Sequence, residues 1–178
     1  MIQKQKKKTW AWFSKYIRLK YSDQDGMCEC YTCGRKMKWN DRNCQAGHGI
    51  GGRTNSVLFE EDIVRVQCYG CNVCQYGKLD EFGAKLRNEI GMVYDHILKG
   101  KHEVKIFNEL ELKEMEETYK RKAKELAQQK GFTLSSVKTK TNKPKYKKST
   151  VILAKLYPTR KKSKEVLANL KNKKYIEE

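Results

Sequence analysis

The stretch CYTCG, residues 30–34, decides the fold, because its cysteine spacing returns in CYGC at residues 68–71. Two residues between cysteines let one tight turn point both thiols at a single ion, while the amides of the turn offset the thiolate charge. Two such turns together make a tetrahedral site of four thiolates, the geometry that structural zinc prefers. The sequence therefore predicts a zinc site formed by Cys30, Cys33, Cys68 and Cys71.

Other interpretations of the cysteines stay open. All 7 cysteines of the chain lie between Cys28 and Cys74. A redox pair or free buried thiols would also use such residues, and the segments CEC and CNVC offer Cys28 and Cys74 as alternative partners. Metal binding is the simplest interpretation, because clustered cysteine pairs in an intracellular chain usually bind metal. Four thiolates leave no open coordination position, so the predicted zinc is structural.

The charge of the chain favours a polyanionic partner. The 39 Lys and Arg residues exceed the 21 Asp and Glu residues and give a net charge of +18. Segment 131–178 alone holds 14 basic and 3 acidic residues, a net +11. No apolar run approaches the ~20 residues of a membrane span, and the basic start lacks the apolar core of a secretory signal. We expect a cytoplasmic protein that binds nucleic acid and no membrane.

Hydrophobic residues at helical spacing predict three main helices, over residues 9–21, 80–90 and 108–129. Thr9 is expected to cap the first helix, and Asn108, with Glu111 three residues later, the last. Two ion pairs at i,i+4 spacing are expected on the last helix, Glu116–Lys120 and Glu117–Arg121.

The sequence divides into four parts of different composition. They are a basic segment with an aromatic helix (1–27), a zinc-bound core (28–100), a charged helix (101–130) and a lysine-rich tail (131–178). The tail is polar and basic, and we expect it to be largely flexible. Few helical signals fall among the cysteines, so residues 28–78 are predicted to form a compact unit rich in loops.

The order of motifs resembles a known nuclease superfamily. AGH at residues 46–48 lies between the cysteine pairs, and Asn72 follows the second pair directly, as in the HNH (treble-clef, ββα-metal) superfamily. More closely, CYTCG, AGH, FEEDIVRVQCYGCN, YGK and ELELKEMEETYKRKAKEL resemble the lambdoid phage NinG family, also called Rap, of recombination endonucleases. The resemblance spans roughly residues 10–130. It implies an α+β fold with a zinc-stabilised treble-clef core of the HNH type flanked by helices.

The resemblance also implies roles for single residues. His48 would end the first strand of the ββα unit and act as general base towards the water that attacks phosphorus. A histidine suits this role because its unperturbed pKa of ~6.5 leaves it largely neutral at pH 7. Gly47 and Gly49 would let the phosphodiester approach the imidazole. Asn72 would help to hold a catalytic divalent ion, Mg²⁺ or Mn²⁺.

Two positions depart from the superfamily pattern. Gly47 stands where an aspartate commonly binds the catalytic metal, and Gln45 is only a weak polar substitute, because amides are poorer Mg²⁺ ligands than carboxylates. Ile63 stands where an asparagine is expected to orient the base, and the adjacent Asp62 is the candidate to replace it.

Three basic residues are candidates for contacts with phosphates beside the cut, although a lone basic residue is more often simply solvated. They are Arg53, Arg65 and Lys78.

The leading hypothesis is a metal-dependent, structure-selective DNA endonuclease that cuts branched recombination intermediates such as Holliday junctions. The family resemblance alone implies this substrate, recombination proteins as partners, and a place in the cytoplasm of a phage-infected bacterium. Two alternatives stay open, a non-catalytic zinc-stabilised DNA-binding protein and a site-specific HNH endonuclease. His48 separates them, since a binding module has no need of it and would use it only for hydrogen bonds within the hairpin. A monomer and a homodimer are both compatible with the sequence.

Overall fold

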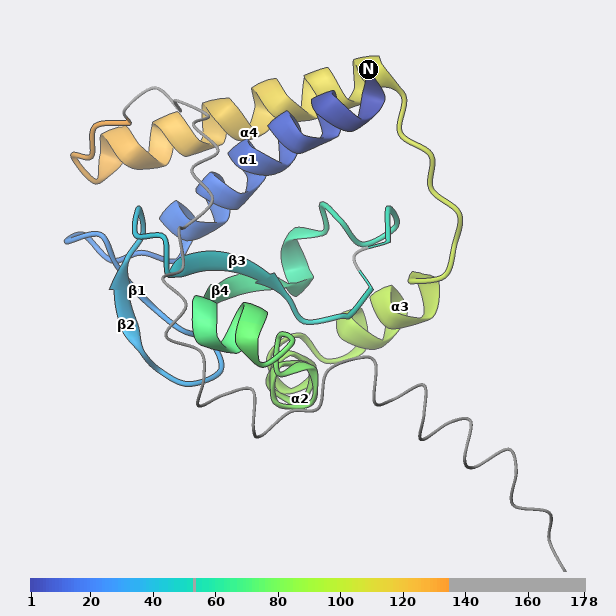
Figure 1. The fold of residues 1–178 in the computed structure, drawn as a ribbon, viewed down its shortest axis with the longest axis horizontal. Coiled ribbons are helices and arrows are strands. Elements are labelled where there is room, and N and C mark those ends of the chain that lie inside the picture. The colour runs from blue at the N-terminus through green and yellow to red at the C-terminus, as the bar shows by residue number, and fades with distance from the viewer. Residues whose placement is uncertain (53, 135–178) are drawn as a thin grey trace, which may run out of the picture. The chain divides into compact units, whose positions relative to one another are not determined.

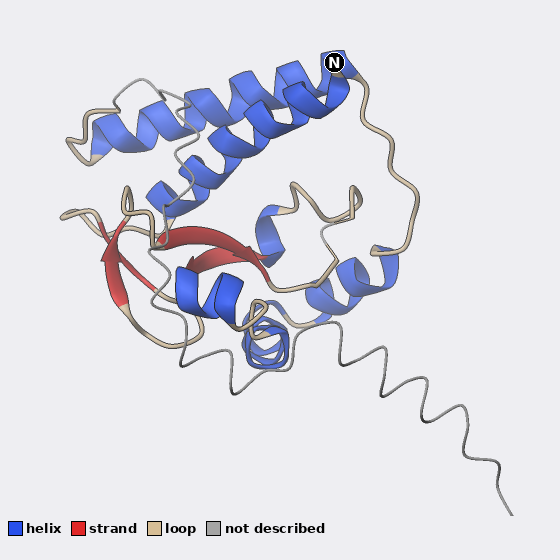
Figure 2. Ribbon diagram, viewed as in Figure 1, coloured by secondary structure: helices blue, strands red, loops and turns tan. Residues whose placement is uncertain are grey.

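The computed structural model describes residues 1–52 and 54–134, which belong to one compact unit, Met1–Ser135. Arg53 and most of the lysine-rich tail, including its predicted flexibility, lie outside the described residues. The elements follow in the order α1 (Ile2–Lys20), β1 (Met27–Glu29), β2 (Lys36–Lys38), β3 (Cys44–His48), η1 (Glu61–Ile63), β4 (Val64–Cys68), η2 (Gly70–Cys74), α2 (Leu79–Ile90), α3 (Met92–Gly100) and α4 (Glu109–Gln129) (Figure 1). The described residues combine helices with two short antiparallel strand pairs, so the α+β prediction is confirmed (Figure 2).

The strands form two separate antiparallel pairs, β1–β2 and β3–β4. In the β3–β4 ladder, Cys44 pairs with Cys68 at one end and His48 pairs with Val64 at the other. Because successive side chains of a strand point to opposite faces, this register sorts the ladder into two faces. One face carries Ala46, His48, Val64 and Val66, and the other carries Gln45, Gly47, Arg65 and Gln67.

Helix α1 begins much earlier than predicted, at Ile2 rather than near Thr9. Lysines dominate its first turns and give no apolar periodicity, although Lys favours helix almost as well as Leu does. Thr9 is therefore an interior residue and not a cap. Its hydroxyl lies 2.8 Å from the Leu112 carbonyl oxygen and so links α1 to α4.

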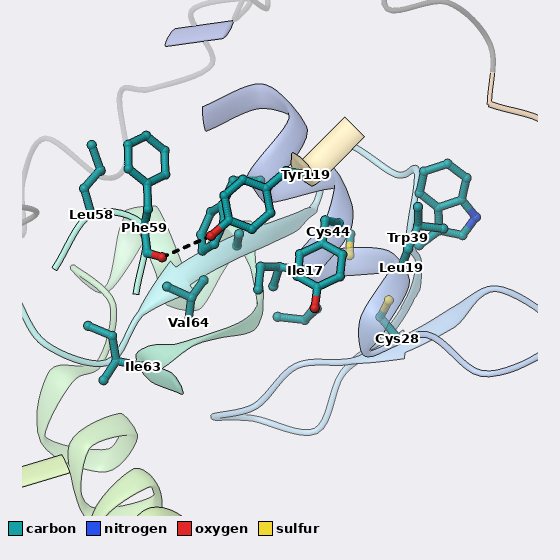
Figure 3. Packing of buried hydrophobic residues seen from close by; sticks show 14 of the residues in the cluster. Ile17, Leu19, Cys28, Trp39, Cys44, Leu58, Phe59, Ile63, Val64 and Tyr119 are labelled. Atoms are coloured by element: carbon teal, nitrogen blue, oxygen red, sulfur yellow. Dashed lines mark hydrogen bonds between the residues drawn. The ribbon is translucent and has the colours of Figure 1, made fainter. Parts of the chain in front are cut away.

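The main core lies between the α1–α4 helix pair and the β3–β4 ladder. The two helices run side by side over the strands (Figure 1). Phe13 of α1 is fully buried, and its ring centroid lies 4.8 Å from that of Tyr119 and 5.7 Å from that of Phe59. The Tyr119 hydroxyl donates to the Phe59 carbonyl at 3.5 Å (Figure 3). These contacts hold the segment before β4 beneath the helices.

The later helices follow the sequence closely. α2 stops at Gly91, whose φ of 55° ends the helix, and Asn108 caps α4 by accepting from the Glu111 amide at 2.8 Å. The predicted i,i+4 ion pairs are wrong, because Glu116 instead accepts a hydrogen bond from Gln5 of α1. The pairs that form on α4 are Lys113–Glu109, Lys120–Glu117 and Arg121–Glu125.

Candidate functional site

Four cysteines gather into one cluster, as the sequence predicts. The sulfur atoms of Cys30, Cys33, Cys68 and Cys71 all lie within 4.8 Å of one another. The first two come from the turn between β1 and β2, where Gly34, at φ 73°, lets its amide reach the Cys30 carbonyl at 2.9 Å. Four sulfurs around one point suit a metal ion such as zinc, whereas a redox pair needs only two.

Hydrogen bonds and burial shift the pKa values of the clustered thiols in opposite directions. Burial acts to raise the pKa of Cys30, but hydrogen bonds from the Thr32 hydroxyl and from backbone amides outweigh it and lower that pKa to about 6. Burial and the neighbouring thiols raise the pKa of Cys71 to about 12. A metal ion binds cysteines as thiolates, so its positive charge would favour deprotonation of the clustered thiols. A tetrahedral zinc fits this donor set, with Cys30, Cys33, Cys68 and Cys71 as its ligands.

The three remaining cysteines lie outside the cluster. Cys28 is buried, and its thiol donates to the Arg18 carbonyl at 3.3 Å. Cys44 is buried at the start of β3, and Cys74 is exposed at the end of η2. The alternative pairs built on Cys28 or Cys74 are therefore wrong, and the simpler C-x-x-C pairing holds.

His48 is the last residue of β3, as expected, but it is enclosed rather than open. Its side chain is 7% exposed, and its ring stacks on Trp10 of α1 at 5.1 Å between centroids and 17° between planes. Nε2 lies 3.0 Å from the carbonyl oxygen of Leu58. A carbonyl oxygen only accepts, so Nε2 carries the proton in this contact.

The two glycines beside His48 serve packing, which corrects the expectation that they keep space for a phosphate. A Cβ on Gly47 would lie 2.9 Å from Cδ of Gln67, and one on Gly49 would lie 2.7 Å from Cδ1 of Phe82. Leu86 crowds the same side of Gly49. Both glycines are buried where other side chains already fill the room.

Asn72 lies away from His48. It sits in η2 and donates from Nδ2 to Oε1 of Gln45 at 2.7 Å, near the Cys44–Cys68 end of the ladder. His48 is three residues further along β3, roughly 10 Å away at the strand rise, and faces the opposite side. The structure therefore brings Asn72 together with Gln45 and not with the imidazole.

The side chains around Asn72 do not fit a magnesium or manganese site. Gln45 already accepts a hydrogen bond from Asn72, and Oε1 of Gln67, which lacks a hydrogen-bond partner among the described residues, is closed to solvent. Amides without a carboxylate are a poor ligand set for Mg²⁺, which also keeps several waters. The four-cysteine cluster is the only group of three or more potential His, Cys, Asp and Glu ligands found in the described residues.

A backbone carbonyl group, and not the expected side chain at position 62 or 63, is the partner of Nε2 of His48. Ile63 is fully buried, and its carbonyl accepts from the Gly49 amide at 2.8 Å. Asp62 is exposed in η1, and the carbonyl of Leu58 is the partner of Nε2. No sequence signal marked Leu58, because any residue type supplies a carbonyl.

Arg65 is a structural residue, which corrects its assignment to phosphate binding. It is 5% exposed, pairs with Glu89 at 2.7 Å and donates to the backbone carbonyls of Glu61, Asp62 and Val64. Its guanidinium has no free side for DNA. Lys78, at φ 46°, pairs with Glu81 at 2.8 Å and remains a candidate, while Arg53 lies outside the described residues.

A basic hollow beside His48 was not found from the sequence. It has a volume of about 350 Å³ and is lined by Gln3, Lys6, Lys7, Trp10 and Leu58. Two of these residues, Trp10 and Leu58, are the ones that hold the imidazole. The sequence did not reveal this hollow because the predicted helix started near Thr9, so Lys6 and Lys7 were not assigned to it.

The fold and the site define a small α+β protein whose strand hairpin is joined to a four-cysteine metal-binding cluster. The chain belongs to the bacteriophage lambda NinG protein family, whose model matches residues 2–129. This match begins and ends with α1 and α4, so it covers nearly all the described fold. The chain matched no curated protein and no solved structure. Within the described residues, no helix has the length and apolar character needed to cross a membrane.

Proposed function

We propose that this protein is a phage recombination endonuclease that hydrolyses phosphodiester bonds in branched DNA, with His48 as general base. The observation that carries the proposal is the position of His48. It ends the first strand of a hairpin whose other strand delivers Cys68 to the four-thiol cluster. Family membership supports the coarser part of this proposal, a phage recombination-related role, and host cytoplasm and recombination proteins are its expected setting.

In the proposed reaction, the imidazole of His48 takes a proton from a water molecule. The water oxygen bonds to phosphorus, the bond from phosphorus to the leaving sugar oxygen breaks, and that oxygen takes a proton from solvent. The Leu58 carbonyl fixes the tautomer by accepting from Nε2–H, and it stabilises the imidazolium that forms. No step is assigned to a divalent ion, because the side chains near Asn72 do not fit one.

Zinc would have a structural role in this scheme. Held by Cys30, Cys33, Cys68 and Cys71, it would fix the turn after β1 to the end of β4 and so support the hairpin that carries His48. Four protein ligands leave it no position for a water molecule.

One observation favours a second candidate, a non-catalytic zinc-stabilised DNA-binding protein. His48 is 7% exposed and stacked on Trp10, which is how a purely structural histidine is expected to lie. Catalysis requires the scissile phosphate and a water molecule to reach the ring past Trp10.

A cleavage assay separates the two candidates. The zinc-loaded wild-type protein should nick a branched DNA faster than a linear duplex, and His48→Ala should cut about 10²–10⁴-fold more slowly, the usual value of a positioned general base. His96→Ala is the matched control, because His96 is exposed on α3. DNA binding without cleavage by the wild-type protein, over a range of divalent metals, would leave the binding module as the better account.

A further inference from the structure

The hollow at the start of α1 has the composition of a site for anions. Its walls combine two lysines and a glutamine with the apolar surfaces of Trp10 and Leu58. Apolar walls beside charged groups raise the local potential, because surfaces of low dielectric constant focus the field lines. The volume of about 350 Å³ is in the range of small-molecule sites.

No carboxylate of the described residues pairs with the lysines of this hollow. Among the described residues, Lys6 donates to the neutral side chain of Asn55, and neither Lys6 nor Lys7 makes an ion pair. The first turn of α1 contains no acidic residue. The lysines of α4 differ, since Lys113 and Lys120 each pair with a glutamate of their own helix.

A second hollow has a different charge. The cavity between α3 and the segments beside it has a volume of about 470 Å³ and mixes acidic with basic residues, namely Glu60, Glu103, Lys99 and Lys105. Its charges are of both signs, so it offers no preference for a polyanion. The α1 hollow is basic without any acidic side chain in its lining.

We propose that the α1 hollow binds backbone phosphates of the DNA substrate, one at Lys6 and one at Lys7. This inference rests on the proposed function and names the element that brings the substrate to His48. A phosphate seated there lies one side chain from the imidazole, since Trp10 and Leu58 each line the hollow and contact His48. Binding of this kind reads charge and not base sequence.

The test compares two double variants of the full-length, zinc-loaded protein that remove the same charge from the same helix. Lys6→Gln/Lys7→Gln changes the hollow, and Lys4→Gln/Lys8→Gln changes exposed lysines outside it. Binding of a labelled four-way DNA junction is measured by fluorescence anisotropy over a series of salt concentrations. Loss of two phosphate contacts should weaken binding about 50-fold at 0.1 M salt and lower the slope of log K against log salt by about 2. The control pair should change binding less than about threefold.

The outcomes are distinct. Equal weakening by the two double variants would overturn the inference, because general electrostatics would then explain binding. Lys7→Gln alone guards against misfolding, since Lys7 is exposed and has no hydrogen-bond or ion-pair partner in the part of the chain that the structure describes, and it should weaken binding by about 8-fold. If polyglutamate competed as strongly as DNA at equal charge, the site would instead suit an acidic protein, which also contradicts the inference. If the double variant Lys6→Gln/Lys7→Gln bound and cleaved DNA normally, the phosphate site would be refuted but the proposed nuclease activity would not. If binding depended on these lysines but the wild-type protein cleaved no DNA, only the proposed nuclease activity would be refuted.

Discussion

The two ends of the β3–β4 ladder are built in different ways. At one end, Cys44 faces Cys68 beside four thiols whose positions follow from two short C-x-x-C turns. At the other end, His48 faces Val64, and its surroundings come from α1 and from the segment that carries Leu58. The structure of the cysteine end therefore follows from short sequence motifs and metal binding. The structure of the histidine end depends on packing between segments that are distant in the sequence.

The largest effect is expected at the cysteine end. Cys33→Ser should abolish metal binding and unfold the region around residues 28–78, because the binding free energy of a structural zinc, roughly 10–16 kcal/mol, is largely folding free energy. Zinc content by elemental analysis and a thermal melt measure this. Cys74→Ser is the control, since Cys74 is exposed and lies outside the cluster. A purified wild-type protein without bound metal would refute the zinc site.

An intermediate effect is expected beside His48. Gly49→Ala should lower the free energy of unfolding by about 2 kcal/mol, because the new methyl group overlaps the buried side chains of Phe82 and Leu86. Gly100→Ala, where the nearest atom is 3.5 Å away in a flexible glutamate, should change it by less than about 0.5 kcal/mol. Urea denaturation gives both values. If Gly49→Ala kept full stability but lost DNA cleavage, the glycine would be reserved for substrate after all.

The smallest effect concerns how the helices dock at the histidine end. Burial acts to raise the pKa of Glu61, but hydrogen bonds from Lys122 of α4 and Tyr16 of α1 outweigh it and lower that pKa. A carboxylate whose pKa is lowered in the folded state stabilises the protein at pH values above its unfolded pKa of ~4.3. This stabilisation is lost as the pH falls through its pKa in the folded state.

Glu61→Gln should therefore reduce stability at pH 7 by about 0.5 kcal/mol and flatten the decline in stability as the pH falls below the unfolded pKa of ~4.3. The modest size follows from the partial exposure of these groups. Urea denaturation across this pH range measures it, with Glu117→Gln, an exposed residue on α4, as control. An unchanged acid slope in Glu61→Gln would show that this carboxylate does not anchor the helices.

The same contrast explains what the sequence could predict. The four cysteine ligands, the cap at Asn108 and the end of α2 at Gly91 depend on short spacings, so pattern and propensity were sufficient. The burial of His48 was not predictable, because it requires knowing that α1 starts at Ile2 and places Trp10 on the ring. Arg65 was misassigned for the same reason, since its partner Glu89 lies on another element, α2.

The central claim is that His48 moves a proton, and chemical rescue tests it most directly. Single-turnover cleavage of a branched DNA by zinc-loaded His48→Ala is measured with added imidazole and with substituted imidazoles of different pKa. If the residue is the general base, these compounds should restore cleavage, and the rate per neutral base should rise with the pKa of the compound. Rescue that is independent of pKa, or full activity of His48→Ala without any added base, would contradict the account.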